Sequence, residues 1–135
     1  MNWLGFSLLA LGLWGVWGFL GKVAAQHLPS PMIYLLAISG HLAVVAYLLG
    51  RGIGAVAWEP WGMGAALGSG LAMAVGLLFF YEALGRGPAA AVVPLTALYP
   101  AVTVVLSRVF LQEALTLRHV TGLALALVAG WLLSK

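Results

Sequence analysis

Long apolar stretches separated by short polar breaks set the pattern of this chain. A helix that crosses a bilayer needs about 20 mainly apolar residues, and five stretches are long enough to qualify. The breaks between them carry prolines, charged side chains or both. The pattern therefore predicts five transmembrane helices, over about residues 2–21, 32–50, 61–85, 88–111 and 116–133.

The breaks hold residues that end or begin helices. Pro29 and Pro31 block continuation of a helix through the first break. Thr116 is placed to cap the fifth helix. The breaks are too short for an independent domain, so we expect a single membrane domain over residues 1–135. No basic residue precedes the first apolar run, which we interpret as a retained helix and not as a signal peptide.

Composition supports an all-α integral membrane protein. Hydrophobic residues make up 64% of the chain and charged residues 7%, whereas a soluble domain is about a quarter charged. Lipid must therefore be the solvent for most of the surface. The basic residues stand singly, which gives no nucleic-acid surface.

The side chains available leave little room for catalysis. The chain has no cysteine and no aspartate, and its histidines at 27, 41 and 119 do not have a metal-binding spacing. It also has no phosphate-binding loop. We therefore expect no enzyme activity, no metal and no cofactor.

The basic residues are balanced between the two sides of the predicted bundle. Three lie on the side of the N-terminus and three on the other: Arg51, Arg108 and Arg118 against Lys22, Arg86 and Lys135. Orientation in a membrane normally follows an excess of Lys and Arg on the cytoplasmic side. The balance favours insertion in both orientations and pairing as an antiparallel homodimer. A single orientation set by other factors is the alternative.

The fourth predicted helix combines hydroxyl side chains with two prolines. Thr96, Tyr99 and Thr103 fall on one helical face, and Ser107 extends it. Pro94 and Pro100 each remove a backbone donor and leave a carbonyl without its usual partner. We expect this helix to line a substrate cavity. Hydroxyls that bond to carbonyls of their own helix are the alternative.

His41 lies at the middle of the second helix. An ionisable side chain at that depth in the membrane is rare and usually belongs to a functional site. Histidine changes charge near neutral pH, so we predict a role in proton coupling. A neutral histidine bonded to a nearby hydroxyl is the alternative. Trp14 and Trp17 of the first helix either line the same cavity or pack against glycines, and Tyr81 is a further candidate for the cavity.

Charged residues near helix ends are candidates for gates or ion pairs. They are Lys22, Glu82, Arg86, Arg108 and Glu113. Small residues also recur at packing distance. In the third helix they are Gly64, Gly68, Ala72 and Gly76, for which we favour packing within the chain.

The chain resembles the EamA-type domain of the drug/metabolite transporter superfamily over essentially its whole length, and four segments carry this resemblance. They are LWGVWGFLGK (13–22), YEAL (81–84), VVPLTALYPAVTVVLSRVFLQEALTLR (92–118) and GLALALVAG (122–130). The resemblance implies a location in the bacterial cytoplasmic, or inner, membrane. Most members carry two inverted five-helix repeats, and this chain supplies one, so it is expected to be half of a ten-helix transporter.

Two comparisons within that superfamily refine the expectation. Around Glu113 the family pattern is Gly-Glu-Arg, whereas this chain has Gln112 and Ala114 on either side. The related small multidrug resistance proteins carry a glutamate in their first helix, and residues 2–21 hold no carboxylate. The same proton/cation-drug exchange is therefore not expected. Likeness to the final helix of those proteins predicts a dimer contact through Gly122, Ala126 and Gly130.

The function predicted from these features is a secondary transporter subunit. As an antiparallel homodimer in the lipid bilayer, it would move a small metabolite by alternating access. Two alternatives stay open: a non-transporting membrane partner or assembly subunit, and one half of a heterodimeric transporter.

Overall fold

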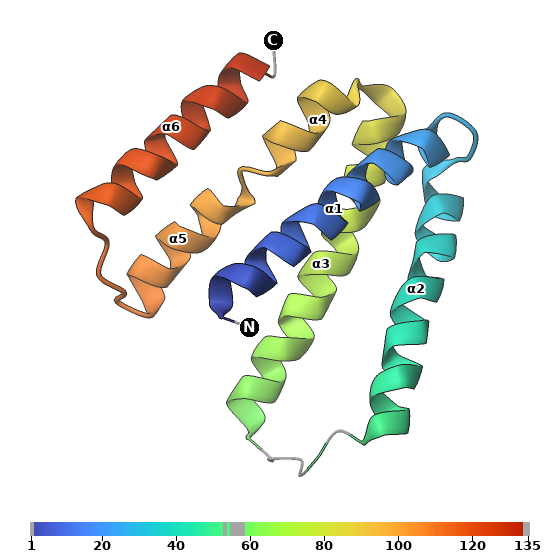
Figure 1. The fold of residues 1–135 in the computed structure, drawn as a ribbon, viewed down its shortest axis with the longest axis horizontal. Helices are drawn as coiled ribbons and strands as arrows, with labels where there is room; N and C mark the ends of the chain where they lie inside the picture. The colour runs from blue at the N-terminus through green and yellow to red at the C-terminus, as the bar shows by residue number, and fades with distance from the viewer. Residues whose placement is uncertain (1, 53, 55–58, 134–135) are drawn as a thin grey trace. The chain divides into compact units, whose positions relative to one another are not determined.

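The computed structural model describes residues 2–52, 54 and 59–133, and no strand occurs among them. Six helices follow one another, as Figure 1 shows: α1 (Trp3–Ala25), α2 (Ser30–Arg51), α3 (Pro60–Arg86), α4 (Ala89–Thr96), α5 (Tyr99–Phe110) and α6 (Leu117–Leu133). The predicted all-α class is therefore confirmed for these residues. Two compact units divide the chain, Met1–Gly85 and Arg86–Lys135.

Four segments are long and apolar enough to cross a membrane. They are α1, α2, α3 and the stretch Ala89–Phe110, which contains both α4 and α5. The last helix, α6, is also apolar but shorter, with 17 residues.

Side chains cap the first and third helices. The side-chain oxygen of Asn2 accepts a hydrogen bond of 3.0 Å from the backbone N–H of Gly5. The carboxylate of Glu59 accepts from the backbone N–H groups of Trp61, at 3.1 Å, and of Gly62. Each cap satisfies donors that a helix cannot satisfy internally. A carboxylate also interacts favourably with the positive end of the helix dipole.

The predicted cap at Thr116 is confirmed, and its partner is unusual. The backbone N–H of His119 donates to Thr116 Oγ1 at 3.4 Å, and the backbone N–H of Thr116 donates to His119 Nδ1 at 3.4 Å. This is the reciprocal geometry of a capping box, with histidine where glutamate or glutamine is usual. Accepting through Nδ1 requires the neutral ring with its proton on Nε2.

The first unit packs at one end only. Its buried residues lie where α1 ends, α2 begins and α3 ends: Gly18, Gly21, Ile33, Phe80, Tyr81 and Leu84. A Cβ built on Gly21 would lie 3.2 Å from Tyr81 Cε1 and 3.4 Å from Leu84 Cδ1. The glycine therefore allows α1 and α3 to approach closely.

The opposite end of the first unit is open. Every described residue from 38 to 73 is exposed in the single chain. A Cβ built on Gly64, Gly68 or Gly76 meets no atom of the described chain within 4 Å. The intrachain packing expected for this ridge is therefore not found within the first unit. Within this unit the helices diverge before the ridge can reach a neighbouring helix.

The fourth predicted span, over residues 88–111, is not one continuous helix. It is interrupted at Ala97 and Leu98, which separate α4 from α5. Pro94 lies inside α4, and Pro100 stands in the first turn of α5. Neither proline can donate to the helix ladder, and the residue before a proline avoids helical geometry. Two prolines six positions apart therefore break the span near its middle.

In the second unit, α4 packs against α6. A Cβ built on Gly130 would lie only 2.6 Å from Leu98 Cδ1 and 3.0 Å from its Cγ. The side chain of Leu98 thus occupies the space that a larger residue at 130 would need. Gly130, predicted as part of a dimer contact, is buried within its own chain.

The loop after α5 contains a residue in a strained conformation. Gln112 has φ of 55°, in the left-handed region, and it is the non-glycine residue with positive φ in the described chain. Helices often end with a left-handed residue, most often glycine. The Gly-to-Gln departure noted in the sequence therefore falls where the backbone favours glycine.

Candidate functional site

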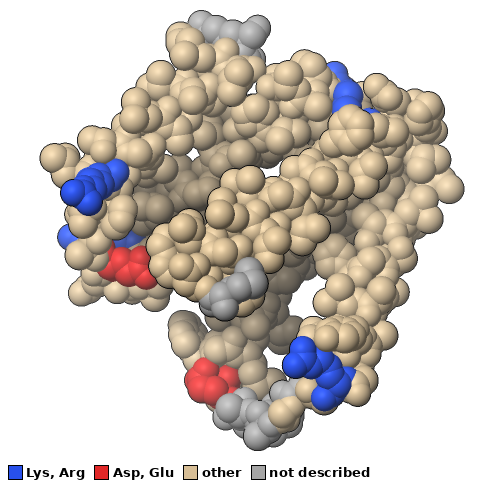
Figure 2. All heavy atoms as spheres, in the orientation of Figure 1, with Lys and Arg blue, Asp and Glu red and all other residues tan. Residues whose placement is uncertain are grey.

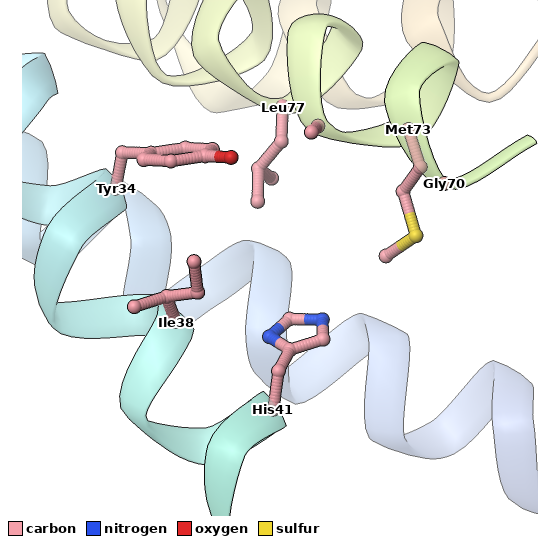
Figure 3. Close-up of a pocket in the computed structure, with 7 residues that line it drawn as sticks. Tyr34, Ile38, His41, Gly70, Met73 and Leu77 are labelled. Atoms are coloured by element: carbon pink, nitrogen blue, oxygen red, sulfur yellow. The ribbon is translucent and has the colours of Figure 1, made fainter. Parts of the chain in front are cut away.

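The centre of the first unit holds a groove between α2 and α3. It has a volume of about 280 Å³ and is lined by Tyr34, Ile38, His41, Gly70, Met73, Ala74 and Leu77. The α2 residues have spacings of 4 and 3, and the α3 residues of 3, 1 and 3, so each set forms one helical face. Figure 3 shows the α2 side chains projecting towards Met73 and Leu77.

His41 is the ionisable group that the sequence singled out, and the groove includes it. It stands 11 residues after Ser30 and 10 before Arg51, at the middle of α2. Its Nδ1 lies 3.4 Å from the carbonyl oxygen of Ala37. A carbonyl only accepts, so this contact favours the ring with its proton on Nδ1. The Nε2 atom is then an acceptor. The partner is a backbone carbonyl and not the hydroxyl considered from the sequence.

Tyr34 is a groove residue that sequence reasoning missed. It lies seven positions before His41, two helical turns away on the same face. That spacing was the signal that could have found it. Its hydroxyl both donates and accepts. The remaining lining is apolar or small, so Tyr34 and His41 supply the polar chemistry of the groove.

Trp17 and Tyr81 come together, but at the packed end of the unit and not in the groove. Tyr81 is 2% exposed. Trp17 stacks on Phe80 with ring centroids 4.7 Å apart and an interplanar angle of 20°. This cluster packs α1 against α3, and none of its three residues lines the groove. Trp14, the other tryptophan predicted for the cavity, is 61% exposed and does not line the groove.

The hydroxyl stripe of the fourth span belongs to the second unit. Thr96 Oγ1 donates to the carbonyl oxygens of Val92, at 2.8 Å, and Val93, at 3.0 Å. Thr103 Oγ1 lies 3.4 Å from the carbonyl oxygen of Tyr99. Both threonines thus bond to their own helix. Tyr99 itself is 57% exposed in the single chain.

The gate candidates contact backbone carbonyls. Lys22 Nζ donates to the carbonyl oxygen of Leu84 at 2.8 Å, which ties the end of α1 to the last turn of α3. Arg108 donates to the backbone carbonyl of Glu113 at 3.3 Å, across the end of α5. Positive side chains at these positions suit the negative end of a helix dipole.

Glu82 lines a second hollow, of about 260 Å³, near the start of α2. Arg86 stands in the last turn of α3. On the face shown in Figure 2, charged atoms form small separate groups and the rest of the described surface is uncharged. No group of three potential metal-ligating side chains occurs in the part of the chain that the structure describes.

Comparison with known proteins places these features in a family context. Residues 1–135 match the family described as the EamA-like transporter family. The chain is 32% identical over 128 residues to the uncharacterized protein MJ1333.1 of Methanocaldococcus jannaschii. That similarity covers 95% of this chain and 93% of the archaeal protein. No solved structure matches the chain significantly.

Proposed function

This chain belongs to the EamA-like transporter family, and on that premise we propose that it is a secondary transporter subunit for a small metabolite. The family and the apolar helices make it an integral, multi-pass membrane protein with a transporter-like function. The family comprises transporters and not enzymes. The observation that carries the proposal is the His41 groove, which lies at the midpoint of two spanning helices. Substrate sites of secondary transporters lie near this depth.

Two copies, related by an inverted arrangement, would complete the transporter. The sequence predicts five membrane spans, half of a ten-helix transporter, and its Lys and Arg residues are balanced between the two predicted sides. The exposed described residues from 38 to 73 include Ile38, His41 and Met73 of the groove and most of the uncovered glycine ridge of α3. A second copy would cover this surface and enclose the groove. Gly122 and Ala126, both exposed on α6, remain candidates for the dimer contact.

During alternating access, the open end of the first unit would move in each of the two copies, while the packed end of that unit would stay closed. The contacts of Trp17, Gly21 and Lys22 with the end of α3 hold α1 and α3 together on that side. The described residues from 38 to 73 have no comparable contacts between helices, so they are the part that can rearrange at low cost. We place the protein in the bacterial cytoplasmic membrane, since outer membranes hold mainly β-barrels.

Transport by the purified protein in liposomes tests the proposal. A panel of labelled metabolites, each with liposomes lacking the protein as control, should show uptake of at least one compound. Cross-linking in the same liposomes should give a dimer of this chain alone. Uptake of none of the compounds, with a different membrane protein co-purifying from cells, would instead identify a non-transporting assembly subunit. Uptake only after a second five-helix chain is added would identify half of a heterodimer.

A further inference from the structure

The charged side chains of the described helices all stand near helix ends. Lys22, Arg51, Arg86 and Arg108 lie in last turns, Glu82 lies four residues before the end of α3, and Arg118 is the second residue of α6. Glu59 precedes α3 and Glu113 follows α5. The middle of every described span is therefore free of carboxylates and of permanent positive charge.

The groove can consequently be neutral or positive, but no carboxylate can make it negative. On its α2 side the titratable groups are His41 and Tyr34, and the α3 side contributes only Gly70, Met73, Ala74 and Leu77. When His41 takes up a proton, Nδ1–H keeps its contact with the Ala37 carbonyl. The new proton resides on Nε2, which becomes a donor available to a ligand.

We propose that this groove binds an organic weak acid with an apolar body, as the carboxylate, against protonated His41 and the Tyr34 hydroxyl. This inference rests on the proposed transport function and names its substrate class. A carboxylate and an imidazolium together are neutral, and the hydrogen bond between them is charge-assisted. An organic cation would be buried there without a counter-charge, which is costly.

The remaining lining suits the apolar body of such a molecule. Ile38, Met73 and Leu77 offer aliphatic and thioether surface on both sides of the groove, as Figure 3 shows. Methionine adapts to irregular shapes and contacts aromatic rings favourably. The volume of about 280 Å³ fits a small ligand, since pockets for drug-sized molecules start at about 300 Å³. Binding one carboxylate with one proton adds no net charge to the site.

Binding to the full chain in lipid nanodiscs tests this inference with three probes of similar size. They are benzoate, benzyl alcohol and benzyltrimethylammonium, with empty nanodiscs as the blank. Calorimetry at about pH 5.5 and about pH 8 brackets the ordinary ionisation of histidine. We expect benzoate to bind about tenfold more tightly at the lower pH and more tightly there than either other probe; this corresponds to about 1.4 kcal/mol.

Two substitutions and one matched control connect the effect to the groove. His41→Gln should remove the pH dependence of benzoate binding. Tyr34→Phe should weaken binding about three- to tenfold, the usual cost of one lost hydrogen bond. His27→Gln changes a histidine that lies between α1 and α2, outside the groove. It should leave both the affinity and its pH dependence unchanged.

Three results would overturn the inference: no benzoate binding at the lower pH, binding of the cation at least as tight as that of benzoate, or an unchanged pH dependence in His41→Gln. Liposome uptake separates this failure from failure of the transport proposal. Uptake of a cation or a neutral compound, without benzoate binding, would refute the substrate class and leave transport standing. Benzoate binding without uptake of any compound would refute transport and leave the site standing.

Discussion

The indole N–H of Trp17 donates a hydrogen bond of 3.1 Å to the hydroxyl oxygen of Tyr81. The two residues are 64 positions apart, and the bond joins α1 to α3 at the packed end of the first unit. Tyr81→Phe would leave the indole N–H without this acceptor. We expect a loss of about 1 kcal/mol in the free energy of unfolding, because a part-buried donor is left unsatisfied. Denaturation of the purified protein in mixed micelles would measure it.

A double-mutant cycle separates that bond from simple packing. In a Trp17→Phe background, Tyr81→Phe should cost clearly less than it does alone, since the donor is already gone. Tyr47→Phe is a suitable control, because Tyr47 is 62% exposed and should change stability by less than about 0.5 kcal/mol. Equal costs of Tyr81→Phe in both backgrounds would show that the hydrogen bond contributes nothing.

Gly130→Ala should destabilise the packing of α4 against α6. The added methyl would meet three atoms of Leu98 at 2.6 to 3.1 Å, so the whole leucine side chain must move. Overpacking of this kind costs about 1–3 kcal/mol. The second substitution Leu98→Ala should recover much of the loss, because it vacates the same space. Failure of Leu98→Ala to rescue Gly130→Ala in a thermal unfolding experiment would contradict the observed contact.

Gln112→Gly should stabilise the protein. A side chain in the left-handed region costs about 1–2 kcal/mol, which glycine avoids, and the greater freedom of glycine in the unfolded chain offsets part of the gain. We therefore expect a net gain of about 0.5–1 kcal/mol in the free energy of unfolding. Gln112→Val, which puts a β-branched residue at φ of 55°, should lower stability. A lower stability of Gln112→Gly than of the natural chain would refute this account.

Removing one arginine should change the ratio of the two membrane orientations. Arg51→Gln changes the Lys and Arg count of the two predicted sides from three against three to two against three. More chains should then keep the C-terminus in the cytoplasm. Arg86→Gln removes a charge from the other side and should shift the population in the opposite direction. Paired C-terminal reporters, one active only inside and one only outside, would measure the ratio. Reporter signal from one side for all three chains would exclude dual orientation.

The sequence carried most of the information on where the helices lie. Apolar stretches of spanning length locate helices, because lipid requires the backbone of each span to satisfy itself. The cap at Thr116 could also be predicted from the sequence, because the bond joins residues only three positions apart. The break at Ala97 and Leu98 was not predicted, although both prolines were seen. A proline in a membrane helix can kink it or interrupt it, and neighbouring packing decides between these outcomes.

The site was harder to predict, because it depends on contacts between helices. The position of His41 at the midpoint of α2 marked it as a site candidate. The sequence alone could not show that Trp17 and Tyr81 lie outside the groove that contains His41. All three looked like polar or aromatic groups inside a membrane. The close approach at Gly21 places Tyr81 in a packed cluster, whereas the divergence of α2 and α3 leaves His41 facing open space. The spacing of seven residues from His41 places Tyr34 on the same face of α2, but only the structure shows that α3 lines the groove on that face.

Two helices of this protein, α3 with 27 residues and α6 with 17, differ in length by ten residues. At 1.5 Å per residue these are about 40 Å and about 26 Å, against a hydrocarbon core of about 30 Å. A bilayer cannot match both lengths at once, so we expect α3 to tilt or to extend beyond the hydrocarbon core and the bilayer beside α6 to become thinner. Lipids with short acyl chains relieve the strain at α6, and those with long chains increase it. Membrane thickness is thus a variable to which this small protein should respond.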